Sequence, residues 1–134
     1  VTLENNSNLA AKAASGSARF DGYVICPASG TTIGKIAAGI SDNLATRSAL
    51  VAMKERRKLI IVPREAPYST PHLKAMFNLS EWGAVILPAS PGFYQSPRNI
   101  EDLIDFVVAR ILDQLDVDHT LGKRWTGEEV PSED

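Results

Sequence analysis

The sequence lacks the features that mark several classes of protein. No unbroken apolar run approaches the roughly 20 residues that span a bilayer, and no basic segment followed by an apolar one opens the chain. The single cysteine, Cys26, excludes an internal disulfide, and the two histidines stand far apart without metal-ligand spacing. These absences predict a cytoplasmic protein that holds no metal, in which Cys26 is a small apolar strand residue.

An excess of positive charge is also missing. The 134 residues include 14 Lys and Arg against 16 Asp and Glu, for a formal net charge of -2, which argues against charge-driven nucleic-acid binding. A hydrophobic content of 44% with 22% charged residues is ordinary for one globular domain with one core. We expect an irregular lead-in over residues 1–20, with one helical turn near residues 9–14, and a mobile acidic tail over 126–134.

Apolar segments alternate with helical patterns along the rest of the chain. Short apolar runs predict strands at 23–27, 59–62 and 84–88, and spacing and capping residues predict helices at 33–39, 44–56, 70–82 and 100–115. This alternation predicts a three-layer α/β fold, a parallel sheet with helices on both faces. Three strands are few for such a sheet, so we expect the chain to be part of a larger domain or to depend on partners.

Two loops that follow predicted strands carry candidate ligand-binding groups, because ligands of parallel sheets bind beyond the carboxyl ends of the strands. The first loop, Ser29-Gly30-Thr31-Thr32, opens a helix and could cradle an anion, although ordinary turn chemistry explains it equally well. The second carries Arg64 and Glu65 between Pro63 and Pro67, and a surface ion pair is its alternative explanation.

The third loop, residues 89–97, is rich in proline and aromatic residues. Tyr94 could supply a ring wall and a hydroxyl donor there, or could simply cover the core. Arg47 and Lys54 stand two helical turns apart on one face and could reach the same anion. Arg56 and Arg57, at the end of that helix, complement its dipole.

Three further polar residues, one arginine and two histidines, lie outside these loops. Arg110 lies at the margin of the apolar stripe of that helix, where partial burial would require a carboxylate or a ligand phosphate as partner. His72 and His119 have no visible nucleophile or carboxylate partner, so we interpret both as structural.

Several of these segments, in order, match the motifs of one family. From Tyr23 to Trp125 the chain resembles the UbiX-type flavin prenyltransferases, in the fold group of homo-oligomeric flavin-containing decarboxylases. The matching motifs are Cys26–Thr32, Asn43-Leu44 with Arg47, Lys54–Arg57, Val62–Pro67, Gly83–Pro88, and Pro91–Tyr94 with Pro97. The resemblance implies a Rossmann-like or flavodoxin-like parallel sheet.

The resemblance also implies a reaction. Such enzymes join reduced FMN to the dimethylallyl group of dimethylallyl phosphate through N5 and C6 of the flavin, without a metal. The product, prenylated FMN, serves UbiD-type decarboxylases in ubiquinone biosynthesis or aromatic acid metabolism. A large homo-oligomer, a homododecamer, is implied as well.

Site residues carry over by position. The implied FMN contacts are Ser29, Gly30, Thr31, Thr32, Arg64 and, less firmly, Arg47; the implied dimethylallyl phosphate contacts are Lys54, Tyr94, Arg110 and Trp125; the implied catalytic residues are Glu65, Lys54, Tyr94 and Arg110. Physically, a cationic clamp with a tyrosine hydroxyl suits a phosphate leaving group, and an aromatic wall suits an allylic cation. Glu65 is placed to relay a proton, with Arg64 keeping it oriented.

One departure from the family leaves alternatives open. The usual first strand, with its Gly-Ala-Ser-Gly turn, does not precede Tyr23, so we expect an incomplete record of a longer protein or a truncated relative. A flavin-dependent decarboxylase acting on a cysteine-derived carboxylate is one alternative, against which the loop Pro91–Tyr94 argues. A non-catalytic flavin-binding subunit is the other, against which the complete set of charged residues argues.

Overall fold

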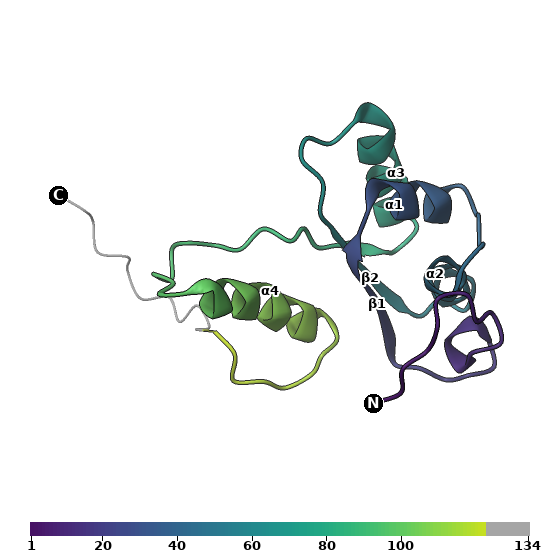
Figure 1. Ribbon diagram of the computed structural model, residues 1–134, viewed down its shortest axis with the longest axis horizontal. Helices are drawn as coiled ribbons and strands as arrows, with labels where there is room; N and C mark the ends of the chain where they lie inside the picture. Colours follow the sequence, from purple (N-terminus) through teal and green to yellow (C-terminus); the bar gives the residue numbers. More distant parts are fainter. Residues whose placement is uncertain (123–134) are drawn as a thin grey trace. The chain divides into compact units, whose positions relative to one another are not determined.

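The computed structural model describes residues 1–122 and forms two compact units (Figure 1). The first unit is Val1–Ala89, and the second is Ser90–Asp134, described as far as residue 122. Each unit is treated by itself below. Tail residues 123–134, including Trp125, lie outside the described part of the chain.

A parallel sheet of three strands organises the first unit. Its order is β1 (Gly22–Ala28), β2 (Lys58–Pro63) and β3 (Val85–Ile86), and Ile60 pairs with residues of both neighbouring strands. Helices form the crossovers that parallel neighbours require: α1 (Gly30–Ala37), α2 (Leu44–Lys54) and α3 (Thr70–Glu81). The predicted parallel α/β sheet is therefore confirmed, with β3 shorter than expected.

The core lies around β2. Leu59 and Ile61 belong to a buried cluster that includes Ile33, Ile36 and Leu79 of the surrounding helices. Ile60 and Val62, which point to the opposite face of the pleat, are 0% exposed as well. The strand is thus buried on both faces, as its unbroken apolar run predicts, and the chain first becomes exposed at its carboxyl end.

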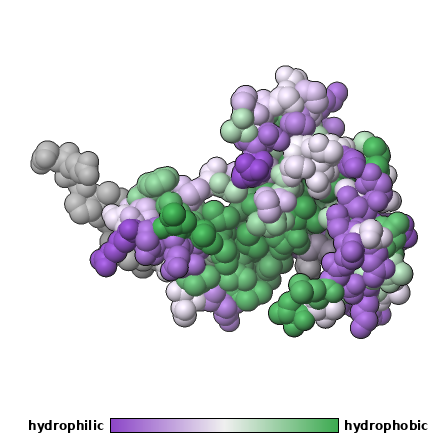
Figure 2. Space-filling model, viewed as in Figure 1, coloured by the Kyte–Doolittle hydropathy of each residue, from purple (hydrophilic) through white to green (hydrophobic). Residues whose placement is uncertain are grey.

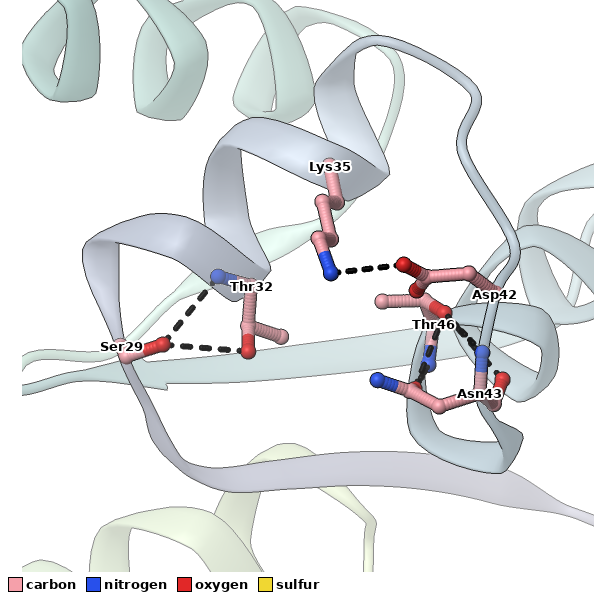
Figure 3. A network of polar contacts seen from close by, with 6 residues as sticks. All are labelled: Ser29, Thr32, Lys35, Asp42, Asn43 and Thr46. Atoms are coloured by element: carbon pink, nitrogen blue, oxygen red, sulfur yellow. Dashed lines mark hydrogen bonds and ion pairs between the residues drawn. The ribbon is translucent and has the colours of Figure 1, made fainter. Parts of the chain in front are cut away.

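Helix α1 begins earlier than the sequence predicts. Ser29 is its N-cap, with Oγ accepting a hydrogen bond from the Thr32 N–H at 3.1 Å, so Gly30 to Thr32 form the first helical turn instead of a loop (Figure 3). The last turn of α1 is tied to the following loop by Lys35, whose Nζ lies 2.7 Å from Asp42 Oδ2. This hydrogen bond with the Lys35 ammonium lowers the pKa of Asp42.

Capping residues define the other helices of this unit. Asn43 caps α2 reciprocally with Thr46: Asn43 Oδ1 accepts from the Thr46 N–H at 2.8 Å, and Thr46 Oγ1 accepts from the Asn43 N–H at 3.2 Å (Figure 3). Helix α2 ends at Lys54, two residues before the predicted end, because Arg56 adopts a φ of 57°. Gly83, with a φ of 101°, follows α3 as the predicted stop.

The first twenty residues are mostly irregular but are fastened to α2. A short 3-10 helix, η1 (Lys12–Ala14), forms where one helical turn was expected. The Asn6 carbonyl oxygen accepts from the Leu44 N–H at 2.7 Å, and Asn6 Oδ1 accepts from the Ala45 N–H at 3.0 Å. Asn6 therefore satisfies two of the free N–H groups that open α2.

The second unit is built on one long helix, α4 (Ile100–Gln114), capped by Asn99 as predicted. Its apolar stripe is only partly covered: Ala109 is buried, whereas Ile100 is 73% and Ile104 55% exposed. Figure 2 shows that apolar side chains also reach the surface of the molecule. Among residues 1–122, no helix has both the length and the apolar character to cross a membrane.

Candidate functional site

The end of β2 and the start of α1 meet, as expected for two loops at the carboxyl edge of a parallel sheet. Glu65 Oε2 accepts a hydrogen bond from the Gly30 N–H at 3.3 Å, across a sequence separation of 35 residues. The N-terminus of α1 therefore already faces an acidic oxygen, as its free N–H groups and helix dipole favour. This contact is direct evidence that an anionic group fits at this edge.

The remaining groups of the Ser29–Thr32 turn differ in availability. Ser29 Oγ and Thr32 Oγ1 lie 3.1 Å apart and serve each other and the cap. Thr31 is exposed, and neither its N–H nor its hydroxyl has a partner within residues 1–122. Of the four predicted cofactor residues, Thr31 presents available donors, whereas the Gly30 N–H is already bonded to Glu65 and Ser29 and Thr32 hold the turn in shape.

Arg64 behaves differently from the prediction. Its main-chain N–H donates to the Ala28 carbonyl oxygen at 3.2 Å and extends the pairing of β1 with β2, while its side chain is exposed. Within the described residues the guanidinium makes no ion pair with Glu65. The surface ion pair is therefore wrong, and so is the expectation that Arg64 orients Glu65, because the Gly30 N–H orients the carboxylate instead.

His72 is a neighbour of this edge that the sequence did not reveal. A Cβ atom added at Gly30 would lie 2.2 Å from His72 Cε1, so position 30 must be glycine while the ring of His72 stands there. His72 Nδ1 is buried and has no hydrogen-bond partner among the described residues. The contact joins two segments far apart in the sequence, which spacing rules do not relate.

The basic residues Arg47 and Lys54 form a second group on α2. They share one face of the helix, as predicted, and that face meets the N-terminal segment: Arg47 Nε donates to the Ala14 carbonyl oxygen at 3.3 Å. Lys54 Nζ lies 3.5 Å from Glu55 Oε1, and a Cβ added at Gly16 would stand 3.4 Å from Lys54 Nζ. Arg47 thus holds η1, and Lys54 lies beside the turn at Gly16.

The Ser15–Ser17 turn was interpreted from sequence only as a loop. Its two hydroxyl groups, Ser15 Oγ and Ser17 Oγ, lie 2.9 Å apart, and Gly16 between them approaches Lys54 and Glu55. Two hydroxyls next to an ammonium group can bind an anionic oxygen. A serine-glycine-serine run is the only signal that could have indicated this.

Arg57 was assigned only to the helix dipole, and the structure corrects that prediction. It lies beyond the end of α2, and its guanidinium donates to the Gly16 carbonyl oxygen at 2.7 Å, to the Ala18 carbonyl oxygen, and to Tyr23 Oη at 3.2 Å. Arg57 therefore fixes the segment that carries the Ser15–Ser17 turn.

Tyr94 and Arg110, in the second unit, line the same cavity of about 650 Å³. Tyr94 is 65% exposed and packs edge-to-face on Phe106 with ring centroids 6.0 Å apart, so it forms a wall of the cavity and does not cover the core. The role of Tyr94 as an aromatic wall beside a prenyl group stays a prediction. Trp125, the other predicted aromatic contact, lies outside the described residues.

Arg110 is exposed, so the expected partial burial is wrong, but it does have a carboxylate partner, one of the two kinds that the sequence left open. Its side chain is 53% exposed, and Nη1 donates to Asp113 Oδ2 at 2.9 Å. The other oxygen of Asp113 lies 2.7 Å from Nε2 of His119, whose side chain is only 7% exposed. His119 therefore does have a carboxylate partner, contrary to the prediction, because the chain turns back after α4.

Cys26 is exposed, although the sequence predicted a buried strand residue. It lies in β1 where the register with β2 shifts between Ile25 and Ala28. At such an irregularity the side chains no longer alternate regularly between the two faces of the sheet. Among residues 1–122, no group of three or more His, Cys, Asp or Glu side chains is arranged to hold a metal ion.

Comparisons with known proteins identify the family that the sequence resembles. A family model described as Flavoprotein matches residues 2–112. The flavin prenyltransferase UbiX of Thermoplasma acidophilum is 56% identical over 120 residues, which cover 90% of this chain and 67% of that protein.

Two solved structures are similar in fold and sequence. A structure described as AnUbiX in complex with FMN and dimethylallyl pyrophosphate has a TM-score of 0.90 and 44% identity, covering 94% of this chain and 67% of that one. A dodecameric FMN-dependent UbiX-like decarboxylase from Escherichia coli O157:H7 has a TM-score of 0.88 and 44% identity, covering 92% and 67%. The chain spans 67% of the length of the Thermoplasma acidophilum relative and 58% of the length of the flavin prenyltransferase UbiX of Pseudomonas aeruginosa, which is 51% identical over 121 residues.

Proposed function

The chain belongs to the Flavoprotein family, among its UbiX-type flavin prenyltransferases, and we propose that it transfers the dimethylallyl group of dimethylallyl phosphate to reduced FMN. In this reaction the allylic C–O bond breaks, inorganic phosphate leaves, and the five-carbon group becomes bonded to the flavin. The observation that carries the proposal is the hydrogen bond from the Gly30 N–H to Glu65. This bond supports the proposal because it holds Glu65, the proposed acid–base residue, at the N-terminus of α1.

FMN fits the residues at this edge. The phosphate and the polar edge of a flavin need hydrogen-bond donors and cations. The exposed N–H and hydroxyl of Thr31 and the exposed guanidinium of Arg64 add donors there. When bound, reduced FMN supplies the nucleophilic N5 and C6 atoms. Ser29 and Thr32 keep the turn rigid, and Arg47 acts from a distance by holding η1.

Positive groups serve the phosphate of the prenyl donor. In the first unit, Lys54, which lies beside the turn at Gly16, is a proposed phosphate contact. In the second unit, taken by itself, Arg110 and the Tyr94 hydroxyl, which line one cavity, are proposed phosphate contacts as well. These groups stabilise the negative charge that grows on phosphate as the C–O bond breaks. The face of Tyr94, and Trp125 in the tail, stabilise the allylic cation.

Glu65 carries a proton in the proposed reaction. One carboxylate oxygen, Oε2, is held by the Gly30 N–H, which leaves Oε1 to accept a proton and pass it on. The backbone donor belongs to a helix, so the carboxylate is fixed more firmly than an arginine side chain would hold it.

Partners follow from the same proposal. Prenylated FMN would be released to a UbiD-type decarboxylase, and self-association as a homododecamer is supported by the dodecameric UbiX-like relative, of which this chain covers 67%. Residues exposed on α3, among them Leu73 at 51% and Phe77 at 61%, supply apolar surface for contacts between copies.

The deciding experiment incubates the protein anaerobically with reduced FMN and dimethylallyl phosphate and measures the mass of the extracted flavin. We expect a gain of one five-carbon unit. Bound flavin of unchanged mass would contradict the proposal. Release of carbon dioxide from an added carboxylic acid would instead favour the decarboxylase, the activity in the description of the Escherichia coli relative.

Replacing the proposed proton carrier tests its role. Glu65→Gln keeps the shape and the contact with the Gly30 N–H, so flavin retention should be unchanged, while turnover should fall by roughly 10²- to 10⁴-fold. Single-turnover formation of prenylated flavin is the measurement. Glu81→Gln, an exposed change at the end of α3, is the matched control. Turnover of Glu65→Gln equal to that of the control would remove Glu65 from proton transfer.

A further inference from the structure

A chain of three polar side chains closes the carboxyl end of α4. Arg110 Nη1 donates to Asp113 Oδ2 at 2.9 Å, and Asp113 Oδ1 lies 2.7 Å from His119 Nε2. All three residues line the cavity that Tyr94 also borders. They belong to the second unit alone, so their geometry is independent of the first.

The hydrogen bonds fix the protonation of His119. Its Nδ1 accepts from the Leu121 N–H at 3.1 Å and therefore carries no proton, so Nε2 must be the nitrogen that donates to Asp113. Both nitrogens are thus satisfied in the neutral ring. Because the ring is 7% exposed and bonded at both ends, it anchors the Asp113 carboxylate in one orientation.

Stability of the fold does not explain the contact between Arg110 and Asp113. Arg110 and Asp113 are three residues apart on an exposed helix face, with side chains 53% and 30% exposed, and such pairs contribute about 0–1 kcal/mol. A carboxylate next to an arginine that binds phosphate also repels the phosphate. The contact between Arg110 and Asp113 can therefore favour phosphate binding only by fixing the orientation of the Arg110 side chain.

We propose that Asp113, anchored by His119, is a positioning residue that orients the Arg110 guanidinium toward the phosphate of the prenyl donor. The inference rests on the proposed function, in which Arg110 binds dimethylallyl phosphate. Asp113 accepts a hydrogen bond from one N–H of the Arg110 guanidinium. Because the guanidinium is planar, this contact also sets the direction of its other N–H donors. A pre-oriented arginine loses less conformational entropy when the phosphate binds.

Asp113→Asn tests the proposal at its centre. The asparagine Oδ1 can still accept from His119 Nε2, but its NH₂ group then faces Arg110, donor against donor, so the contact with Arg110 is lost while the contact with His119 remains. Asp118→Asn is the matched control, since Asp118 lines the same cavity and, among the described residues, makes no hydrogen bond or ion pair with Arg110. Both variants remove one negative charge.

The two variants separate orientation from charge. Loss of a nearby negative charge alone should lower the KM for dimethylallyl phosphate in both. Loss of orientation should lower kcat/KM about 10- to 100-fold in Asp113→Asn alone, as small displacements of a positioned group do. Equal shifts of KM in the two variants would overturn the positioning role. Asp113→Glu, which keeps the charge and moves the carboxylate by one methylene, should fall between wild type and Asp113→Asn.

A second measurement does not depend on turnover. The ¹⁵N NMR signals of the Arg110 guanidinium should show restricted rotation in the wild type and averaged signals in Asp113→Asn, with Asp118→Asn like the wild type. In a titration with inorganic phosphate, the restricted signals of the wild type should shift at a lower phosphate concentration than the averaged signals of Asp113→Asn. Identical Arg110 dynamics in wild type and Asp113→Asn would overturn the proposal, even if Asp113→Asn unfolds at a lower temperature.

The outcomes distinguish this inference from the proposed function. A wild-type protein that makes no prenylated flavin contradicts the proposed function, and the guanidinium signals then decide the Arg110–Asp113 contact by themselves. A wild-type protein that makes prenylated flavin, with Asp113→Asn indistinguishable from Asp118→Asn, contradicts the positioning role alone.

Discussion

The two units of this chain hold their candidate site residues by different means. In the first unit, Glu65 is bonded to the Gly30 N–H of α1, and the carbonyl oxygen of Gly16 is bonded to Arg57, so each of these contacts has a main-chain partner. In the second unit, Arg110 is held by another side chain on a helix whose apolar stripe is half exposed. Main-chain anchoring in a packed core gives rigid geometry, whereas side-chain anchoring on a surface leaves geometry that a ligand can adjust.

The largest expected difference between the units lies in their apolar residues. Ile61→Ala removes a side chain that is 0% exposed at the centre of the sheet, and should lower the free energy of unfolding by about 2–5 kcal/mol. Ile104→Ala, at 55% exposure on α4, should change it by less than about 0.5 kcal/mol. Urea denaturation measures both. Similar losses would mean that the stripe of α4 is covered in solution.

The next difference concerns two arginines. Arg57→Met deletes hydrogen bonds to the carbonyl oxygens of Gly16 and Ala18, and should cost about 1–3 kcal/mol and raise hydrogen exchange over residues 14–18. Arg110→Met deletes one exposed ion pair and should cost about 0–1 kcal/mol. Mass-spectrometric hydrogen exchange with denaturation separates them. Unchanged exchange in Arg57→Met would show that Asn6 and Arg47 fasten the N-terminal segment without Arg57.

The smallest expected effect concerns the ion pair of Lys35 and Asp42, which is exposed although it belongs to the first unit. It tests whether the strength of an ion pair depends on its exposure or on the unit that contains it. Lys35 lowers the pKa of Asp42 in the folded state, so the pair stabilises the protein above the ordinary carboxyl pKa and loses this contribution as the pH falls through the lowered value. Lys35→Met should therefore be slightly less stable than wild type near neutral pH and equal to it once the pH has fallen below the lowered pKa of Asp42. Thermal unfolding across this range, at low salt, is the measurement. A difference that persists in acid would have a cause other than the charge of Asp42.

Local patterns predicted most of the fold. The apolar run Leu59–Val62 and the i, i+3, i+4 stripe of α4 identified a buried strand and a surface helix, because burial imposes these periods on a sequence. Capping chemistry located Asn43, Ser69 and Asn99. The start of α1 was misplaced because Ser29 and the two threonines read equally well as a loop and as a capped first turn.

The candidate site was predicted by residue but not by contact. Placement after parallel strands brought the Ser29–Thr32 turn and Glu65 together correctly, since it is a rule of the sheet. The partners of Arg57, His72 and His119 were missed, because each lies on a segment that sequence spacing does not relate to them. Glu65 was paired with the wrong residue because neighbours in an extended chain point to opposite sides.

The sequence by itself determined the alternation of strands and helices, the buried strand that ends at Arg64, and the family, because these depend on hydrophobic period, capping and ordered motifs within short stretches. Only the tertiary structure decided that Glu65 bonds to Gly30, that Arg57 fastens the N-terminal segment, and that His119 anchors Asp113 beside Arg110. These contacts join groups whose meeting depends on how the chain returns on itself, and no local rule encodes that path.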